Sequence, residues 1–160
     1  MMQFTTIIYL VILFTLNYFT IFHIILWFEV RNKLKRKPIS NNELPHVSIL
    51  VPTFNDEKSI TKSLENLLSI DYPKNKYEVL VIDDGSTDRT YEIIKKYESE
   101  NVRIFRKKNT GKASSMNFGI KRARYEYVAV MDADSFLQRN ALRQCMSHFD
   151  ENDVAAVTSH

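Results

Sequence analysis

A run of 25 residues without a charged side chain, Phe4 to Phe28, is the feature that most constrains how this chain can fold. A helix of that length measures about 37 Å, which is more than the roughly 30 Å hydrocarbon core of a bilayer. The run lacks the basic amino end, the short apolar core and the small-residue cleavage site of a signal peptide. We therefore expect residues 1–30 to form a transmembrane anchor in contact with membrane lipid.

A basic cluster follows this run, and no basic residue precedes it. The cluster contains Arg31, Lys33, Lys35, Arg36 and Lys37. By the positive-inside rule, this asymmetry predicts a single-pass protein of the cell membrane whose carboxyl-terminal domain is cytoplasmic. We interpret residues 31–45 as a basic juxtamembrane linker.

The remainder of the chain has almost balanced charge. From Pro38 onward there are 17 Lys and Arg residues against 18 Asp and Glu residues, so the pI of about 8.9 reflects the membrane edge. A nucleic-acid-binding domain would carry its basic excess on the folded part, and we therefore expect no nucleic-acid partner. A single cysteine, Cys145, excludes an intrachain disulfide.

Residues 46–160 alternate between short apolar runs and helical periodicity, which predicts one α/β domain with a mostly parallel sheet. Strands are predicted at 47–51, 77–82, 102–105, 127–131 and 154–157. Helices are predicted around 60–68, 93–97, 111–123 and 139–149. Because ligands of such sheets bind at the carboxyl ends of the strands, the polar residues that follow strands are the candidate site.

Two acidic motifs follow predicted strands. Capping of the next helix by Ser86 or Asp88 explains part of the first motif, but it does not explain Asp83 beside Asp84 at the end of an apolar run. Two adjacent negative charges at that position need a partner group that offsets their repulsion and their loss of solvation. In the second motif, Asp132 and Asp134 lie on the same side of an extended segment and suit a hard cation, Mg²⁺ or Mn²⁺. Alone, this D-x-D pattern is a weak signal.

The segment Thr110-Gly111-Lys112 resembles the end of a P-loop, but the glycine required four positions before it is missing. A dinucleotide-binding fingerprint is also absent, since the chain has only three glycines. Lys112 at a helix start is a candidate for contact with anionic phosphates. For the basic residues just before it, Arg106, Lys107 and Lys108, we expect the solvated end of a strand.

Four segments in this order resemble the family 2 glycosyltransferases of GT-A fold, a Rossmann-like nucleotide-sugar-binding fold. They are Val-Ser-Ile-Leu-Val-Pro-Thr-Phe-Asn (47–55), Val-Ile-Asp-Asp-Gly-Ser-Thr-Asp (81–88), Asn-Thr-Gly-Lys-Ala-Ser-Ser-Met-Asn (109–117) and Val-Met-Asp-Ala-Asp (130–134). The likeness covers roughly residues 46–157. It is strongest to the membrane-anchored processive group, such as poly-N-acetylglucosamine, hyaluronan and cellulose synthases.

The resemblance implies roles for individual residues. The nucleoside would be held by Pro52, Thr53, Glu57 and Asp84, with Asp83 nearby, and Lys112 would approach the diphosphate or the base. Asp132 would contact the ribose and the metal, and Asp134 would be the more direct metal ligand. The implied cofactor is Mg²⁺ or Mn²⁺.

The resemblance also implies a function: the donor half of an inverting enzyme that transfers sugar from a nucleotide sugar, a UDP-sugar, to a glycan or lipid-linked acceptor. The general base and the acceptor half are expected beyond residue 160, with a second polypeptide as one source. The alternative is a non-catalytic, membrane-tethered nucleotide-sugar binder or partner subunit. A third class, a metal-dependent phosphatase or phosphotransferase, would need its D-x-D pair after the first strand and further Lys and Asp motifs later in the chain. Here the D-x-D pair follows the fourth predicted strand, and we cannot place the later motifs.

Overall fold

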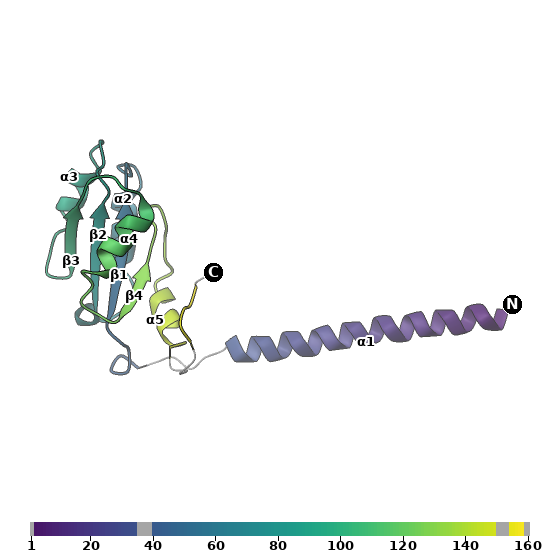
Figure 1. The fold of residues 1–160 in the computed structure, drawn as a ribbon. Helices are drawn as coiled ribbons and strands as arrows, with labels where there is room; N and C mark the ends of the chain where they lie inside the picture. Colours follow the sequence, from purple (N-terminus) through teal and green to yellow (C-terminus); the bar gives the residue numbers. More distant parts are fainter. Residues whose placement is uncertain (1, 35–39, 150–153, 159–160) are drawn as a thin grey trace. The chain divides into compact units, whose positions relative to one another are not determined.

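The computed structural model describes residues 2–34, 40–149 and 154–158 of the chain (Figure 1). The chain divides into two compact units, with the boundary between Lys37 and Pro38. The first unit is a single helix and the second is an α/β domain.

Helix α1 spans Met2–Leu34, and its segment Phe4–Glu29 is long and apolar enough to cross a membrane, with a mean hydropathy of 2.0. The predicted long apolar helix is therefore confirmed. Polar side chains within it bond back to the preceding turn. Asn17 donates to the carbonyl of Leu13 at 2.8 Å, and Thr20 donates to the carbonyl of Leu16 at 2.8 Å. Such bonds lower the cost of placing these groups in an apolar environment.

The second unit is built on a four-stranded parallel sheet with the order β3-β2-β1-β4. Its strands are β1 (Val47–Thr53), β2 (Tyr77–Asp83), β3 (Val102–Arg106) and β4 (Tyr127–Val130). Its helices are α2 (Ile60–Leu68), the short 3₁₀ helix η1 (Lys74–Lys76), α3 (Thr90–Lys95), α4 (Lys112–Ile120) and α5 (Ala141–Met146). The predicted α/β class with a mostly parallel sheet is confirmed.

Helices cover both faces of the sheet, as a buried parallel sheet requires. On one face, Ile49, Val51, Val79 and Val81 form a core with residues of α2, α3 and α5. On the other face, Leu50, Leu80 and Ile82 pack with aromatic side chains of β3 and α4, and Figure 1 shows α4 crossing this face. Helix α4 lies close to the sheet because Gly119 has no side chain. A Cβ there would stand 3.0 Å from the methyl groups of Leu50 and Ile82.

Strand β1 runs two residues beyond its predicted end at Val51 and includes Pro52. Strand β4 pairs with β1 only as far as Leu50, whose carbonyl accepts the N–H of Met131 at 3.0 Å. Because backbone groups alternate sides along a strand, Pro52 faces β4 beyond the paired part of that edge. A residue without an N–H is tolerated at such a position.

The strand predicted at 154–157 is wrong, because residues 154–158 have no regular structure. Ala155 to Thr158 and the edge of β4 line the same cavity, of about 460 Å³. The segment therefore faces β4 across open space and does not hydrogen-bond to it. Val154 and Val157 are partly buried, and Ala155, Ala156 and Thr158 are exposed.

A buried carboxylate, Glu78, ties the amino-terminal ends of the strands together. Its side chain accepts hydrogen bonds from the hydroxyl of Ser48 at 2.8 Å and from the backbone N–H of Arg124 at 2.7 Å. Its other oxygen pairs with the Arg103 guanidinium at 3.0 Å. Glu78 is 1% exposed, so these partners compensate for a charge that water scarcely reaches.

We expect Glu78→Gln to lower the free energy of unfolding by about 1–3 kcal/mol, because the Arg103 guanidinium loses a charged acceptor in a buried setting. Glu98→Gln is the matched control, since Glu98 forms a short-range ion pair with Lys95 in which both side chains are about half exposed. It should change the stability by less than about 0.5 kcal/mol. Urea denaturation of the purified chain measures both, and equal losses would contradict the role given to Glu78.

Candidate functional site

A cavity of about 280 Å³ lies at the carboxyl ends of β1, β2 and β4. It is lined by Pro52, Thr53, Phe54, Asp56, Asp84, Lys112, Ser115, Asp132, Ala133 and Asp134. Six of the residues that the sequence analysis singled out therefore surround one space. Glu57 and Asp83 are not among its lining residues.

The loop after β1 is tied to the loop after β2. Asn55 has a positive φ of 56°, a conformation that Asn adopts more readily than most residues. Its backbone N–H donates to the Ser86 hydroxyl at 3.0 Å, and its side-chain carbonyl accepts the N–H of Thr87 at 2.8 Å. Asp56 accepts from the Thr53 hydroxyl at 2.8 Å, which closes the turn at the cavity wall.

Glu57 and Asp83 belong to the framework around this cavity. Glu57 accepts the backbone N–H of Arg89 at 3.2 Å, which adds to the contact between the two loops. Asp83 is fully buried, accepts the N–H of Ser86 at 3.1 Å, and forms an ion pair with Arg106 at 3.1 Å. The Arg106 guanidinium also stacks over the Tyr91 ring, 4.5 Å from its centroid.

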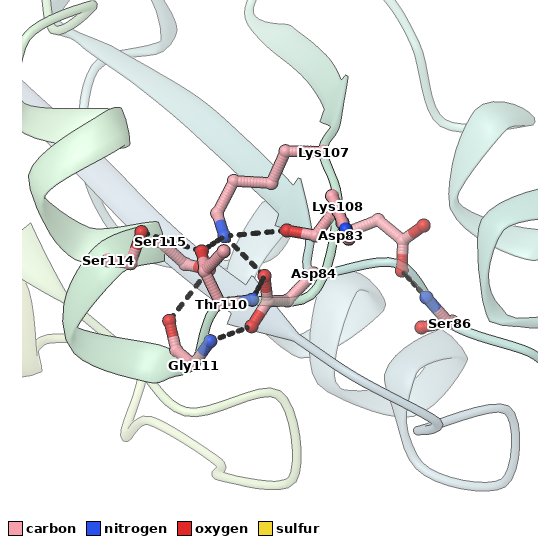
Figure 2. A network of polar contacts seen from close by, with 9 residues as sticks. All are labelled: Asp83, Asp84, Ser86, Lys107, Lys108, Thr110, Gly111, Ser114 and Ser115. Carbon is pink, nitrogen blue, oxygen red and sulfur yellow. Dashed lines mark hydrogen bonds and ion pairs between the residues drawn. The ribbon is translucent and has the colours of Figure 1, made fainter.

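Asp84 lies at the base of the cavity and is 4% exposed. One oxygen accepts the backbone N–H of Thr110 at 3.0 Å and pairs with the Lys107 ammonium, and the other accepts the N–H of Gly111 at 2.7 Å (Figure 2). Burial alone raises the pKa of this carboxyl. The bonds from Lys107, Thr110 and Gly111 outweigh burial, so its pKa lies below the usual value and the group is ionised at neutral pH.

Lys107 was missed by sequence reasoning, which assigned it to a solvated strand end together with Arg106 and Lys108. That interpretation is wrong for Lys107, which is partly buried and pairs with Asp84. Arg106 and Lys108 are exposed as expected, although Arg106 also pairs with Asp83. The sequence signal that could have predicted these two ion pairs is the adjacent pair Asp83 and Asp84, because two buried carboxylates need cations as partners.

Three further residues line the cavity although the sequence did not single them out: Phe54, Asp56 and Ser115. Each lies one to three positions from a predicted site residue.

Lys112 opens α4 and reaches across the cavity to Asp132, with 2.5 Å between Nζ and the carboxylate. Both side chains are about half exposed, so a bound ligand could exchange with this pair. Asp132 and Asp134 are exposed while Ala133 between them is buried. All three residues line the cavity. The segment is a turn, in which the Ser135 N–H donates to the Asp132 carbonyl at 3.0 Å, and is not the extended segment that the sequence predicted.

Within the described residues, no three His, Cys, Asp or Glu side chains gather as a ready metal site. The cavity does supply two exposed carboxylates, Asp132 and Asp134, whose oxygens are the donors that Mg²⁺ and Mn²⁺ prefer. Such ions commonly complete their coordination with phosphate oxygens and water. The donor set therefore fits a hard cation held jointly with a phosphorylated ligand.

Comparisons with known proteins identify the family of this chain. The family model described as glycosyl transferase family 2 matches residues 48–160. A poly-beta-1,6-N-acetyl-D-glucosamine synthase of Staphylococcus aureus strain COL is 36% identical over 136 residues, which cover 82% of this chain and 32% of that protein. The chain thus belongs to glycosyltransferase family 2, an enzyme family, and it spans about a third of the length of such relatives.

Two solved structures show the same fold. The S. aureus TarS fragment 1–349 in complex with UDP-GlcNAc has a TM-score of 0.61 and 35% identity, over 66% of this chain and 31% of that one. The mannosyltransferase PcManGT of Pyrobaculum calidifontis, in complex with GDP-Man and Mn²⁺, has a TM-score of 0.64 and 27% identity, over 81% and 41%. The expected Rossmann-like GT-A fold is confirmed.

Gly85 brings the loop after β2 against the segment after β3. It has a φ of 75°, and a Cβ there would stand 2.9 Å from the backbone nitrogen of Asn109 and 3.1 Å from the Lys107 carbonyl. We expect Gly85→Ala to cost at least about 2 kcal/mol in unfolding free energy, from backbone strain and this clash.

Gly119→Ala is the control for Gly85→Ala, because its new Cβ meets only side-chain methyl groups, at 3.0 Å, on an ordinary helical backbone. Ala also has the better helix propensity by about 1 kcal/mol, so this variant should lose less than half as much stability. Denaturant titration of the two variants checks the order. A larger loss at Gly119 would contradict it.

Proposed function

We propose that residues 46–160 form the donor-binding half of an inverting glycosyltransferase that uses a UDP-sugar and Mg²⁺ or Mn²⁺. The acceptor would be a glycan or a lipid-linked glycan. The observation that carries this proposal is the single cavity where Asp84, Lys112, Asp132 and Asp134 meet at the carboxyl ends of three parallel strands. Ligands of open α/β sheets bind at this edge.

Each part of the cavity has a proposed task. Pro52 and Thr53 form the wall against which the nucleoside lies, and Asp84 at the base accepts a hydrogen bond from its base or ribose. Glu57 and Asp83 act on the nucleoside through the two loops that they hold in place. Lys112 and Asp132 face the diphosphate and the ribose, and Asp134 is the more direct metal ligand.

The charges around the cavity support a metal-dependent ligand. Among the residues that the structure describes, four carboxylates line it, from Asp56, Asp84, Asp132 and Asp134, against the one ammonium of Lys112. Lys107, just behind the lining, neutralises Asp84. The remaining negative charge would repel a diphosphate, so a divalent cation on Asp132 and Asp134 is needed for both to bind. Such a cation supplies positive charge that stabilises the leaving nucleoside diphosphate.

The ligands bound in the two related structures support the donor class. TarS was solved with UDP-GlcNAc and the mannosyltransferase with GDP-Man and Mn²⁺, so both bind a sugar linked to a nucleoside diphosphate. We favour a uridine nucleotide because TarS is the more similar in sequence, at 35% against 27% identity.

The acceptor and its general base are proposed to belong to a part that corresponds to the remainder of the longer relatives, whether on the same chain or on a second polypeptide. The competing proposal is a non-catalytic, membrane-tethered nucleotide-sugar binder that serves a partner subunit. The two differ in whether membranes containing the chain convert labelled donor into product.

Nucleotide binding by the purified chain is the direct test. We expect calorimetry to show UDP binding with Mn²⁺ that is at least about tenfold weaker after chelation with EDTA. Asp134→Asn should weaken the Mn²⁺-dependent part by a similar factor, because it removes a charged metal ligand. Asp71→Asn is the matched control, since Asp71 pairs with Arg143 outside the cavity lining. UDP affinity indifferent to Mn²⁺ would contradict the role of Asp132 and Asp134.

We also propose that α1 spans the cell membrane once and leaves the second unit on the cytoplasmic side. Support comes from the apolar segment Phe4–Glu29 and from the basic residues that follow it. Within α1, the Arg31 guanidinium lies 4.9 Å from the centroid of the Trp27 ring. An aromatic ring beside a cation is typical of a membrane interface.

Protease protection checks this orientation. In intact spheroplasts the domain should resist added protease, whereas in inverted vesicles it should be cut after the anchor, because the basic flank keeps it on the cytoplasmic side. A tag on each end of the chain reports which part survives. Digestion of the domain in spheroplasts alone would contradict the orientation.

A further inference from the structure

Lys107 is a nearly enclosed cation beside the cavity, and the function proposed above gives it no contact with the ligand. Its side chain is 12% exposed. The ammonium pairs with Asp84 and donates to the Thr110 hydroxyl at 2.5 Å and to the Lys108 carbonyl at 3.2 Å. These three acceptors match the three N–H donors of an ammonium group. Lys107 is not among the residues that line the cavity, so it does not face the ligand space.

The contacts of Lys107 close the segment 107–111 around the Asp84 carboxylate (Figure 2). Asp84 accepts the backbone N–H groups of Thr110 and Gly111, the two residues directly before α4. Gly111, at the N-cap position of α4, has no side chain to cap the helix. The carboxylate at the end of β2 thus serves as the negative group at the start of α4, and Lys107 holds its charge in place.

Two separate restraints fix α4. Its far end is held by packing, because Gly119 lies against Leu50 and Ile82. Its near end is held by polar contacts among Asp84, Lys107 and Thr110. The Thr110 hydroxyl also donates to the hydroxyl of Ser114, a residue of α4, at 2.7 Å. The next residue after Gly111 is Lys112, whose ammonium crosses the cavity to Asp132.

We propose that Lys107 is a positioning residue for the donor site: it acts through Asp84 and the segment 107–111 to hold Lys112 over the cavity. The proposal rests on the function proposed above, because the consequence of misplacing Lys112 is weaker binding of a nucleoside diphosphate. A purely structural lysine would affect stability alone. A positioning lysine affects ligand affinity only as long as Lys112 is present.

The test is a double-mutant cycle on the full chain in detergent, with UDP and Mn²⁺ as the probe in calorimetry. Lys107→Met keeps the length of the side chain and removes its charge, and it should weaken binding by at least about tenfold. Lys108→Met is the matched control, because Lys108 is the exposed neighbour and contributes only its backbone carbonyl to the network. It should leave affinity within about twofold.

The decisive arm adds Lys107→Met to Lys112→Met. If Lys107 acts through Lys112, the second substitution should weaken binding by less than about twofold in that background, since coupled residues are not additive. Losses that multiply, or a Lys107→Met variant that binds like the wild type, would overturn the proposal.

A ligand-free measurement separates this inference from the proposed function. In Lys107→Met, amide hydrogen exchange in the peptide 108–116 should accelerate by at least about tenfold while peptides of β1 and β2 keep their protection. Unchanged exchange in 108–116 would overturn the positioning role even if UDP binds.

If the wild type binds neither UDP nor GDP with Mn²⁺, the proposed function fails. The hydrogen-exchange result then decides by itself whether Lys107 positions the segment 107–111. If Lys107→Met fails to fold, Thr110→Val replaces it, because it removes the hydroxyl that lies between Lys107 and Ser114. It should also weaken UDP binding and accelerate exchange in 108–116.

Discussion

The pairing of two adjacent buried carboxylates with two successive cations is the interaction on which the rest of the site depends. Asp83 ends β2 and Asp84 follows it, at 0% and 4% exposure, and a buried ion without a partner costs several kcal/mol. Strand β3 pairs with β2 in a register that sets Asp83 opposite Arg106, so Arg106 and Lys107 arrive where the two charges are. The sheet pairing and the electrostatics of the site therefore stabilise the same arrangement.

From this pair the order of the strands builds the cavity. Because β1 lies between β2 and β4, the loops after these three strands meet at one edge of the sheet. Asn55 joins the first loop to the second, and Asp84 joins the second to the start of α4. The acidic segment after β4 is reached by Lys112 from α4. The walls of the cavity thus come from four distant parts of the chain, and each wall is bonded to at least one other.

The sequence predicted the features that depend on local residue patterns. Short, mostly apolar runs of four to six residues predicted all four strands of the sheet, and the rule for parallel sheets predicted the edge where the polar motifs meet. The sequence could not predict contacts that depend on the register in which the strands pair. The partner of Asp84 is Lys107, 23 positions away, and only the alignment of β3 with β2 brings the two together. The same limit explains the strand wrongly predicted at 154–157, since a short apolar run does not show whether a neighbouring strand lies within hydrogen-bonding distance.

A consequence follows for how substitutions at the site are interpreted. Asp84 already accepts two backbone N–H groups and an ammonium, so only about one of the four acceptor positions of a carboxylate is left for a ligand. Replacing Asp84 removes both the proposed ligand contact and the cap of α4, so a loss in affinity could not be assigned to either one alone. Asp134 is different, because it is exposed at the cavity and α4 does not depend on it. The effect of positioning is therefore measured more directly at Lys107, which does not face the cavity, than at Asp84, where the cap of α4 and the proposed ligand contact use the same two oxygens.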